Sequence, residues 1–344
     1  MFCLLLIGLE EVHALVGNSL SLSGSEGFLR TEGVQIVDGN GQVVLLRGVN
    51  YEGYYWKNPF LHTEADYRYL AKIGFNVVRL PISWAHLEPS PGRFERVYLT
   101  NYVDQDIGWA KKYGIRIVLD MHQDNWARRF PKGGGAPDWT VQQYPQTEAG
   151  MRQAVSNFWI NDTLQDHFIG IWINIASRYA NETVIAGYDI LNEPWVYTSY
   201  ISDLSATNVI NFYEKAISAI RKVDTYHLIF LEPPFGAPLN NVNLPIRANI
   251  VWSPHFYPLS FSAKYFHENA TTLTADFAAK YKKFVLESES PVWIGEFGAF
   301  MKDEKSVSYW LQDATGIFQE HQVGWAWWSY SEGQLIPSSL SPSS

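Results

Sequence analysis

Two glutamates follow short apolar runs that have the character of buried β-strands. Glu193 stands in Asn-Glu-Pro after the run 185–191, and Glu296 stands in Gly-Glu-Phe-Gly after the run 292–294. Pro194 lacks a backbone donor and therefore ends the first strand, which places Glu193 at its end. A pair of carboxyl groups, one protonated and one ionised, is the requirement for hydrolysing a glycosidic bond. The two glutamates are therefore candidates for a proton donor and a nucleophile.

The two carboxyl groups must differ in protonation, and this requires different surroundings. Arg79, after another apolar run, is predicted to hold Glu296 ionised and aimed, and Tyr257 to hydrogen-bond the same carboxylate. His255 is predicted to tune or relay the proton of Glu193. In this hypothesis Glu193 acts first as acid and then as base, while Glu296 attacks the anomeric carbon.

Polar and aromatic side chains at other strand ends are candidates for substrate contacts. The amide of Asn192 could bond the sugar 2-hydroxyl, a contact that strengthens in the transition state, and Trp328 offers a flat floor for the sugar. His122 is interpreted either as a sugar contact or as a buried scaffold residue. Trp195 and Trp126 are candidates for platforms beyond the cleaved bond, with loop packing as the alternative.

Asp120, His122 and Asp124 are also candidates for a metal site. Their spacing of two residues along a strand-to-loop turn is one that metal ligands can have. No further cluster of His or Asp completes such a site in the sequence. We therefore expect neither a metal nor a cofactor, and Asp124 is counted among the candidate substrate contacts.

Strand and helix signals alternate along the chain. Alternation of this kind predicts a parallel sheet, and eight strands in this length favour an α/β fold of the (β/α)8 barrel type. In such barrels the functional residues lie at the carboxyl ends of the strands. The predicted strands are 47–50, 76–80, 115–120, 185–191, 228–231, 250–253, 292–296 and 324–328, and the predicted helices are 66–73, 102–113, 148–180, 208–223, 272–286 and 307–321.

The segment before the first barrel strand has its own organisation. Two apolar stretches, 34–37 and 43–46, flank Asp-Gly-Asn-Gly, which predicts an N-terminal β-hairpin. Residues 1–26 are interpreted as an N-terminal tail or signal remnant, because the apolar run within them is far too short to span a bilayer. Residues 27–344 are predicted to form a single (β/α)8 catalytic domain.

Composition restricts the partners. The formal net charge of −9 argues against nucleic acid as the main partner. Cys3 is the only cysteine, which excludes an intramolecular disulfide and a Cys-based zinc site. We expect a monomer without a transmembrane segment, acting on a carbohydrate or glycolipid, including one presented at a membrane surface. Three Asn-X-Thr sequons, which matter only after export, favour a secreted or extracytoplasmic location, with a cytoplasmic one left open.

Taken together, these residues resemble glycoside hydrolase family 5, a family of barrels whose acid/base and nucleophile follow strands 4 and 7. The resemblance covers about 33–330 and implies Glu193 as the acid/base and Glu296 as the nucleophile. The supporting Arg, two His, Tyr and Trp of the family correspond to Arg79, His122, His255, Tyr257 and Trp328.

A narrower similarity is to the endoglycoceramidase and steryl-glucosidase branch. It is carried by Leu-Asp-Met-His-Gln-Asp-Asn-Trp at 119–126 and by Gly-Gly-Gly-Ala-Pro-Asp-Trp at 133–139. That branch removes a β-linked sugar from a lipid, so the similarity implies cleavage of β-glucosidic or similar β-hexosidic bonds in a glycoside with an apolar aglycone. An endo-β-1,4-glucanase or mannanase acting on polysaccharide stays open, as does the remote alternative of a non-catalytic sugar-binding barrel.

Overall fold

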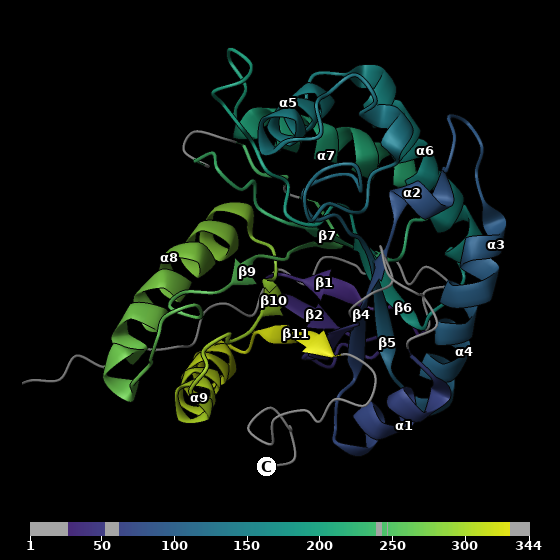
Figure 1. Cartoon of the computed structure of the whole chain (residues 1–344). Coiled ribbons are helices and arrows are strands. Elements are labelled where there is room, and N and C mark those ends of the chain that lie inside the picture. The colour runs from purple at the N-terminus through teal and green to yellow at the C-terminus, as the bar shows by residue number, and fades with distance from the viewer. Residues whose placement is uncertain (1–26, 52–61, 239–242, 246, 331–344) are drawn as a thin grey trace, which may run out of the picture.

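A closed sheet surrounded by helices forms the centre of the computed structural model (Figure 1). The structure describes residues 27–51, 62–238, 243–245 and 247–330, so the tail predicted at 1–26 lies outside the described residues. The strands of the sheet are β3 (Arg47–Tyr51), β4 (Val77–Ile82), β5 (Arg116–Met121), β6 (Ile185–Asp189), β7 (Leu228–Leu231), β8 (Ile250–Trp252), β9 (His255–Phe256), β10 (Trp293–Phe297) and β11 (Gly324–Tyr330).

The order of the strands closes the sheet into a barrel. It runs β8-β7-β6-β5-β4-β3-β11-β10-β9, and every neighbouring pair is parallel. The two outermost segments, β8 and β9, are halves of one stretch that is interrupted at Ser253-Pro254. Proline cannot donate to a ladder, so it divides this strand. Counting the two halves as one strand gives eight, which confirms the predicted (β/α)8 barrel.

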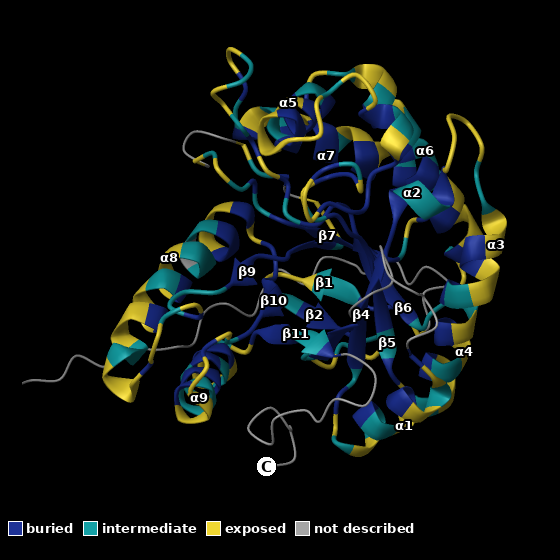
Figure 2. Cartoon of the chain, in the orientation of Figure 1, coloured by how far each residue is buried: buried dark blue, intermediate teal, exposed yellow. Residues whose placement is uncertain are grey.

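The helices cover the outside of the sheet. They are α1 (Glu64–Lys72), α2 (Trp84–Leu87), α3 (Arg96–Tyr98), α4 (Asp104–Tyr113), α5 (Glu148–Phe158), α6 (Asp162–Tyr179), α7 (Ala206–Ile220), α8 (Ala270–Ser288) and α9 (Glu304–Glu320). Figure 2 shows their inner faces buried and their outer faces exposed. Four begin at a residue whose side chain accepts from the backbone: Glu95 for α3, Thr147 for α5, Asn161 for α6 and Asp303 for α9. No helix of the described chain is both long and apolar enough to cross a membrane.

The predicted N-terminal hairpin is present, and an earlier strand that was not predicted pairs with its first arm. β1 (Arg30–Glu32) pairs antiparallel with β2 (Gln35–Val37) across a turn in which Gly33 has a φ of 55°. The expected partner, 43–46, makes a single bridge between Val37 and Val43. The side chain of Asp38 accepts from two backbone amides of the following loop, which supports the bend there.

The hairpin lies at the amino end of the barrel. Leu29 and Ile36 pack with inward-facing side chains near the starts of the strands, including Val77, Leu228 and Trp293. A second, larger apolar cluster fills the space between sheet and helices. The barrel is therefore filled at its base, and the polar strand ends lie at the opposite, carboxyl end, where barrel active sites form.

Candidate active site

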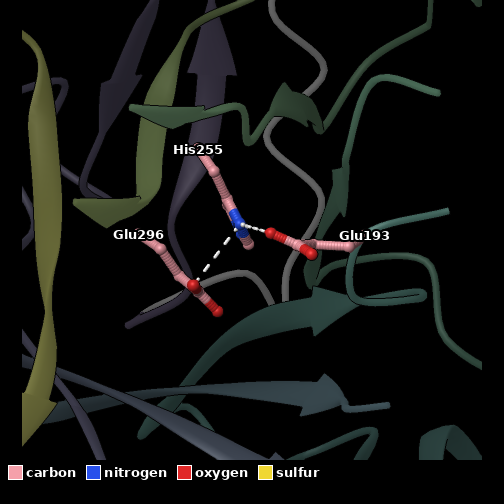
Figure 3. Close-up of side chains that lie close together, drawn as sticks. All are labelled: Glu193, His255 and Glu296. Atoms are coloured by element: carbon pink, nitrogen blue, oxygen red, sulfur yellow. Dashed lines mark hydrogen bonds and ion pairs between the residues drawn. The ribbon is translucent and has the colours of Figure 1, made fainter. Parts of the chain in front are cut away.

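The two predicted catalytic glutamates meet at the carboxyl end of the barrel. Glu193 follows β6, and Glu296 is the fourth residue of β10. One carboxylate oxygen of each and one ring nitrogen of His255 lie within 4.8 Å of one another. His255 points between the two carboxylates (Figure 3), because the register of β9 on β10 sets it beside Glu296. The structure thus brings the predicted pair to within reach of a single sugar carbon.

The backbone of Glu193 is held in an uncommon conformation. Its φ is 43°, in the left-handed region that residues with a Cβ rarely adopt. Its amide donates to the carboxylate of Glu232 at 2.8 Å, and Gln123 donates to its carbonyl at 3.1 Å. These contacts aim the side chain into the mouth, where its Oε1 lies 3.0 Å from Nδ1 of His255. Such strained backbone is characteristic of functional positions.

Glu296 is buried and held from two sides. Nη1 of Arg79 donates to its Oε1 at 2.8 Å, and the hydroxyl of Tyr257 donates to its Oε2 at 2.9 Å. Both contacts match the sequence prediction. Only about one-twentieth of the residue is exposed, so water reaches Glu296 far less than Glu193, whose side chain is 27% exposed. The two carboxyl groups therefore have different surroundings, but burial alone favours the neutral form of Glu296, which is the reverse of the expected protonation.

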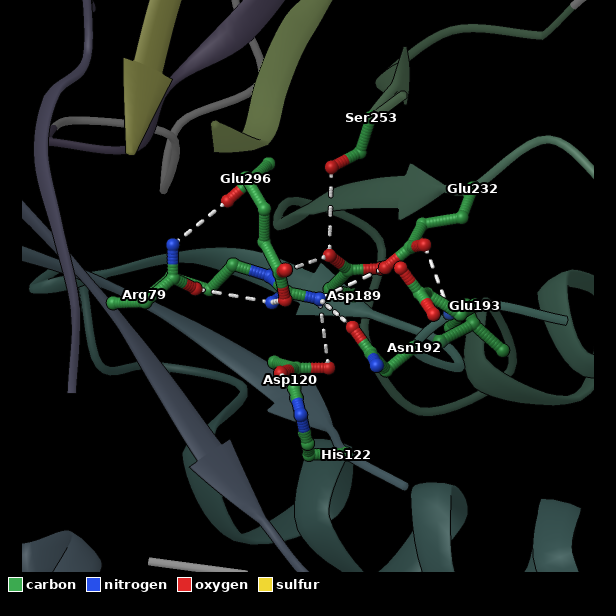
Figure 4. A network of polar contacts seen from close by, with 12 residues as sticks. Arg79, Asp120, His122, Asp189, Asn192, Glu193, Glu232, Ser253 and Glu296 are labelled. Carbon is green, nitrogen blue, oxygen red and sulfur yellow. Dashed lines mark hydrogen bonds and ion pairs between the residues drawn. The ribbon is translucent and has the colours of Figure 1, made fainter. Parts of the chain in front are cut away.

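Arg79 is the central cation of the site. Its guanidinium is fully buried and contacts four carboxylates and two amides (Figure 4): Asp120, Asp189, Glu232, Glu296, Asn50 and Asn192. Burial disfavours its charged form, but the four carboxylates outweigh burial and hold the pKa of Arg79 well above its usual value. Buried charge on this scale is tolerated only when each group has partners.

Asp189 is a member of this network that the sequence prediction missed. It is the last residue of β6, within a run that the sequence pattern predicts as an apolar strand, and its Oδ2 accepts from Nε of Arg79 at 3.0 Å. Burial raises the pKa of Asp189 well above its usual value, although the charge of Arg79 opposes this. Glu232, directly after β7, contacts both Arg79 and the amide of Glu193. A lone aspartate, Asp189, and a lone arginine, Arg79, each stand in an otherwise apolar strand. Because a buried charge needs a partner, this pattern could have predicted their ion pair.

The proton balance of the catalytic trio centres on His255. Burial raises the pKa of Glu296 to about 7, against the lowering effects of His255 and Arg79. Burial also acts to raise the pKa of Glu193, but the hydrogen bond and charge of His255 outweigh it, so this pKa lies below its usual value. Burial would lower the pKa of His255, yet Glu232 and Glu296 raise it well above its usual value. The directions of the two shifts favour a proton on the imidazole of His255 over one on the carboxyl group of Glu193.

A flat surface lies on the other side of the pair. The ring of His122 stacks on Trp328, with centroids 5.3 Å apart and planes 10° apart. Nδ1 of His122 lies 2.5 Å from Asp120, and Nε2 lies 3.9 Å from the half-exposed Asp124. Burial acts to lower the pKa of His122, but Asp120 raises it above its usual value. His122 is thus a buried scaffold residue that also supports the aromatic floor.

The two tryptophans predicted as sugar platforms differ in their exposure to solvent. Trp195 is 38% exposed and borders a cavity of about 540 Å³ that also touches Glu193 and Asp124. Trp126 is only 2% exposed and packs against Trp84 and Phe158 in the core. The prediction that Trp126 binds substrate is wrong, since a buried ring offers no face to a sugar. Its φ of 69° turns it inward from the loop after β5.

Two groups of side chains in the described part of the chain have metal-like spacing. One is the trio of Glu193, His255 and Glu296, and the other is Asp120, Asp189 and Glu232. The second group encloses the guanidinium of Arg79, which supplies the positive charge at its centre. The first consists of two carboxyl groups and an imidazole, which are groups that can exchange protons with one another.

A (β/α)8 barrel with two glutamates converging at its carboxyl end, one of them ion-paired to a buried arginine, defines a glycoside hydrolase. The family model described as cellulase (glycosyl hydrolase family 5) matches residues 37–334. The chain belongs to glycosyl hydrolase family 5, and its similarity extends to the endoglycoceramidase-like branch.

The chain is similar to proteins that are named for several different activities. The chain is 25% identical to a β-xylosidase of Phanerodontia chrysosporium, over 89% of this chain and 71% of the relative. It is 23% identical to endoglucanase C of Acetivibrio thermocellus, over 78% of this chain and 84% of the relative. The structure of endo-glycoceramidase II from Rhodococcus sp. in complex with a five-membered iminocyclitol superposes with a TM-score of 0.75 at 26% identity, covering 90% of this chain and 78% of that chain.

Proposed function

We propose that this protein is a retaining β-glycosidase that removes a sugar from an apolar aglycone by double displacement. The observation that carries the mechanism is the approach of the Glu193 and Glu296 carboxylates to within 4.8 Å. Retaining enzymes need carboxyl groups about 5 Å apart, whereas inverting enzymes need a wider gap that admits a water molecule. The likeness to endo-glycoceramidase II supports the apolar aglycone.

In the first step the oxygen of Glu296 forms a bond to the anomeric carbon while the bond to the leaving oxygen breaks. Glu193 supplies the proton that the leaving oxygen takes up. In the second step Glu193 removes a proton from water, and the oxygen of that water displaces Glu296. Arg79 and Tyr257 stabilise the Glu296 carboxylate as it leaves, since both donate hydrogen bonds to it.

The hydrogen bond between Glu193 and His255 accounts for the source of the catalytic proton. An ionised Glu193 beside a protonated His255 holds the same protons as a neutral Glu193 beside a neutral His255. The atoms are 3.0 Å apart, so transfer between the two arrangements needs no movement of the chain. A bound substrate displaces water from the partly exposed Glu193, which favours its neutral form. The proton is then in place for the leaving oxygen.

A second candidate is an endo-acting glucanase, and the cavity of about 540 Å³ beside Glu193 favours it. Its wall is partly charged, with Asp124, Lys132, Glu148 and Arg152, and Trp195 supplies one exposed ring. Hydroxyl-rich sugars bind to such mixtures of charged groups and flat rings. A leaving group bound in this cavity would be a sugar rather than a lipid.

The mechanism is tested with Glu193→Gln and Glu296→Gln. Each removes a group that acts in the chemical step, so we expect turnover of an aryl β-glycoside to fall by roughly 10³-fold or more. Proton NMR of the wild-type reaction should show the β-anomer of the released sugar first. Release of the α-anomer, or near-normal turnover in either variant, would contradict the proposal. Far-UV circular dichroism of both variants checks that the fold is kept.

The substrate is tested with a matched panel. Aryl β-glucosides, β-galactosides, β-xylosides and β-cellobiosides identify the sugar, and cello-oligosaccharides are then compared with an octyl glycoside of that sugar. We expect a higher kcat/KM for the octyl glycoside. Higher activity on cello-oligosaccharides, with disaccharide products, would select the glucanase. Inactivity towards every β-glycoside would exclude both.

A further inference from the structure

We propose that Phe261 and Phe300 form the contact surface for the apolar part of the leaving group. Both rings are exposed, 73% and 47% respectively, and they stack on each other at 4.8 Å with planes 7° apart. Phe261 lies in the loop after β9, and Phe300 lies in the loop between β10 and α9. This inference rests on the proposed function, because it names the residues that would distinguish a lipid-like aglycone from a sugar.

The stacked pair is connected to the catalytic residues through ring contacts. Both rings lie close to Tyr257, with centroids 6.2 and 5.9 Å from it. Tyr257 in turn hydrogen-bonds the nucleophile Glu296 and lies edge-on to His255. The amide of Phe300 donates to the carbonyl of Ser260 at 2.9 Å, which holds the two loops together. The pair is therefore a fixed part of the rim of the catalytic mouth.

The order of the strands places this pair on the leaving-group side. Between β6, which carries Glu193, and β10, which carries Glu296, one half of the barrel consists of β7, β8 and β9. The other half consists of β5, β4, β3 and β11, and it holds the stacked rings of His122 and Trp328. A sugar on that aromatic floor has its anomeric carbon between the two glutamates. Its leaving group then extends over the first half, where Tyr257 and Phe261 form the rim.

The first half contains a series of aromatic side chains in contact with one another. From Glu193 outward, Trp195 contacts Phe235, and Phe235 contacts His255 beside Tyr257. Exposed phenylalanine rings gain free energy when an apolar partner covers them. An alkyl chain that leaves the cleaved oxygen along this series reaches the stacked pair. An alkyl chain covers the exposed edges of the pair without burying any hydroxyl group, whereas a sugar bound there would have to bury hydroxyl groups without polar partners from these two rings.

The experiment measures how kcat/KM depends on alkyl chain length. The probes are methyl, butyl, hexyl and octyl β-glycosides of the sugar that the aryl panel selects, each below its micelle concentration. We expect kcat/KM of the wild type to rise by up to about fourfold per methylene, the equivalent of burying one methylene group. In the double variant Phe261→Ser, Phe300→Ser we expect the slope of log kcat/KM against chain length to fall close to zero. The slope is independent of the absolute activity of each variant.

Two variants make the result specific. Phe266 is another exposed phenylalanine, 51% exposed, in the same loop between β9 and α8, and its ring does not contact the Phe261–Phe300 pair. We expect the Phe266→Ser variant to keep the wild-type slope. Phe261→Leu with Phe300→Leu keeps an apolar surface, so we expect most of the slope to remain. Thermal unfolding of each variant checks that it is folded.

Several outcomes would overturn the inference. The wild-type slope could persist in the double serine variant. The dependence on chain length could also be lost only in the Phe235→Ser variant. That result would place the alkyl chain of the substrate in the cavity of about 450 Å³ that Phe235 lines. A wild type that hydrolyses aryl glycosides without any dependence on chain length contradicts this inference and leaves the proposed mechanism standing. Inactivity on all β-glycosides removes the proposed function itself and this inference with it.

Discussion

Arg79 sets the charge balance of the site at the level of single residues. One guanidinium, fully buried, faces the carboxylates of Asp120, Asp189, Glu232 and Glu296. Among the described residues no other cation contacts all four carboxylates, so Arg79 balances their charge only in part. The same guanidinium aims Glu296, so the central cation of the network also positions the proposed nucleophile.

Replacing Arg79 should therefore be costly. We expect Arg79→Met to lower the free energy of unfolding by about 3–5 kcal/mol, because it leaves buried carboxylates without their counterion. Asp189→Asn is the matched control, and we expect a change below about 1 kcal/mol, since burial already raises the pKa of Asp189 and favours its neutral form. Urea unfolding at pH 7 measures both. Equal effects of the two substitutions would show that Arg79 does not hold the network together.

The pH dependence of kcat/KM follows from the raised pKa of Glu296. This carboxylate must be ionised to attack, and its pKa is about 7, so kcat/KM should rise as the pH increases through about 7. Although burial raises this pKa, the charge of His255 lowers it. His255→Gln removes that charge, and we therefore expect the acidic limb of the profile to move to higher pH. A limb that stays in place or moves to lower pH is the contrary result, measured with an aryl β-glycoside.

Individual residues also show where sequence reasoning succeeds and where it fails. The contacts of Arg79 and Tyr257 with Glu296 were predictable, because a buried nucleophile needs donors and only a few polar side chains end the strands. Asp189 was missed because it stands in an otherwise apolar run. The prediction that Trp126 contacts the substrate was wrong. The direction of a side chain in a loop depends on the backbone conformation, here with a φ of 69°, and the residue type does not determine that conformation.

Among the elements, β6 must approach β7 closely in order to place Glu193. Gly187, in the middle of β6, makes this possible, since a Cβ there would lie 2.2 Å from the carbonyl oxygen of Leu228. A methyl group at this position would have to displace the backbone of the neighbouring strand. Because Glu193 follows the same strand, a shift of β6 would also change the geometry of the catalytic pair.

Two glycine-to-alanine changes test this packing. We expect Gly187→Ala to lower the free energy of unfolding by about 1–3 kcal/mol through overpacking. Gly170→Ala, within α6, meets nothing within 4 Å and should raise it by about 0.5–1 kcal/mol, because alanine restricts the unfolded chain and favours helix. Urea titrations of the two variants and the wild type provide the measurement. Stabilisation by Gly187→Ala would show that β6 and β7 are less tightly packed than the structure indicates.

The elements themselves followed well from the sequence, with informative exceptions. Alternating apolar runs and amphipathic stretches identified the barrel, since a parallel strand buried on both faces is apolar throughout. The bend at Asp-Gly-Asn-Gly was predicted, and its arms meet at the Val37–Val43 bridge, but the pairing of β1 with β2 was missed because its turn is signalled only by Gly33. The division of the sixth strand at Pro254 depends on hydrogen bonding to two different neighbours, β7 and β10. Such pairing is a property of the closed sheet.

At the scale of the whole molecule, the ionised form of the buried Glu296 lowers the free energy of unfolding. A carboxyl group whose pKa rises on folding binds protons more tightly in the native state than in the unfolded state. Stability then falls as the pH rises between the two pKa values. For Glu296 the window runs from 4.5 to about 7. The buried, ion-paired nucleophile therefore destabilises the folded chain under the conditions in which it is ionised and active.

This cost can be measured by comparing the wild type with Glu296→Gln. Relative to the variant, we expect the free energy of unfolding of the wild type to fall on the order of 3 kcal/mol between pH 4.5 and 7, with no further relative change above pH 8. Glutamine has the same size and does not titrate. Urea unfolding at pH 4.5, 6 and 8 gives the comparison. A difference that is independent of pH would mean that Glu296 has the same proton affinity in the folded and unfolded chain.

The hairpin at the base of the barrel has a consequence for the chemistry at the opposite end. Leu29 and Ile36 fill the amino end, so the departing alcohol and the incoming water share one opening. In a retaining mechanism the sugar is attached to Glu296 during that exchange, and any hydroxyl group near the opening competes with water. An entrance lined with aromatic rings concentrates fatty alcohols more than it concentrates water. We therefore expect the enzyme to be useful in reverse, as a catalyst that attaches sugars to long-chain alcohols.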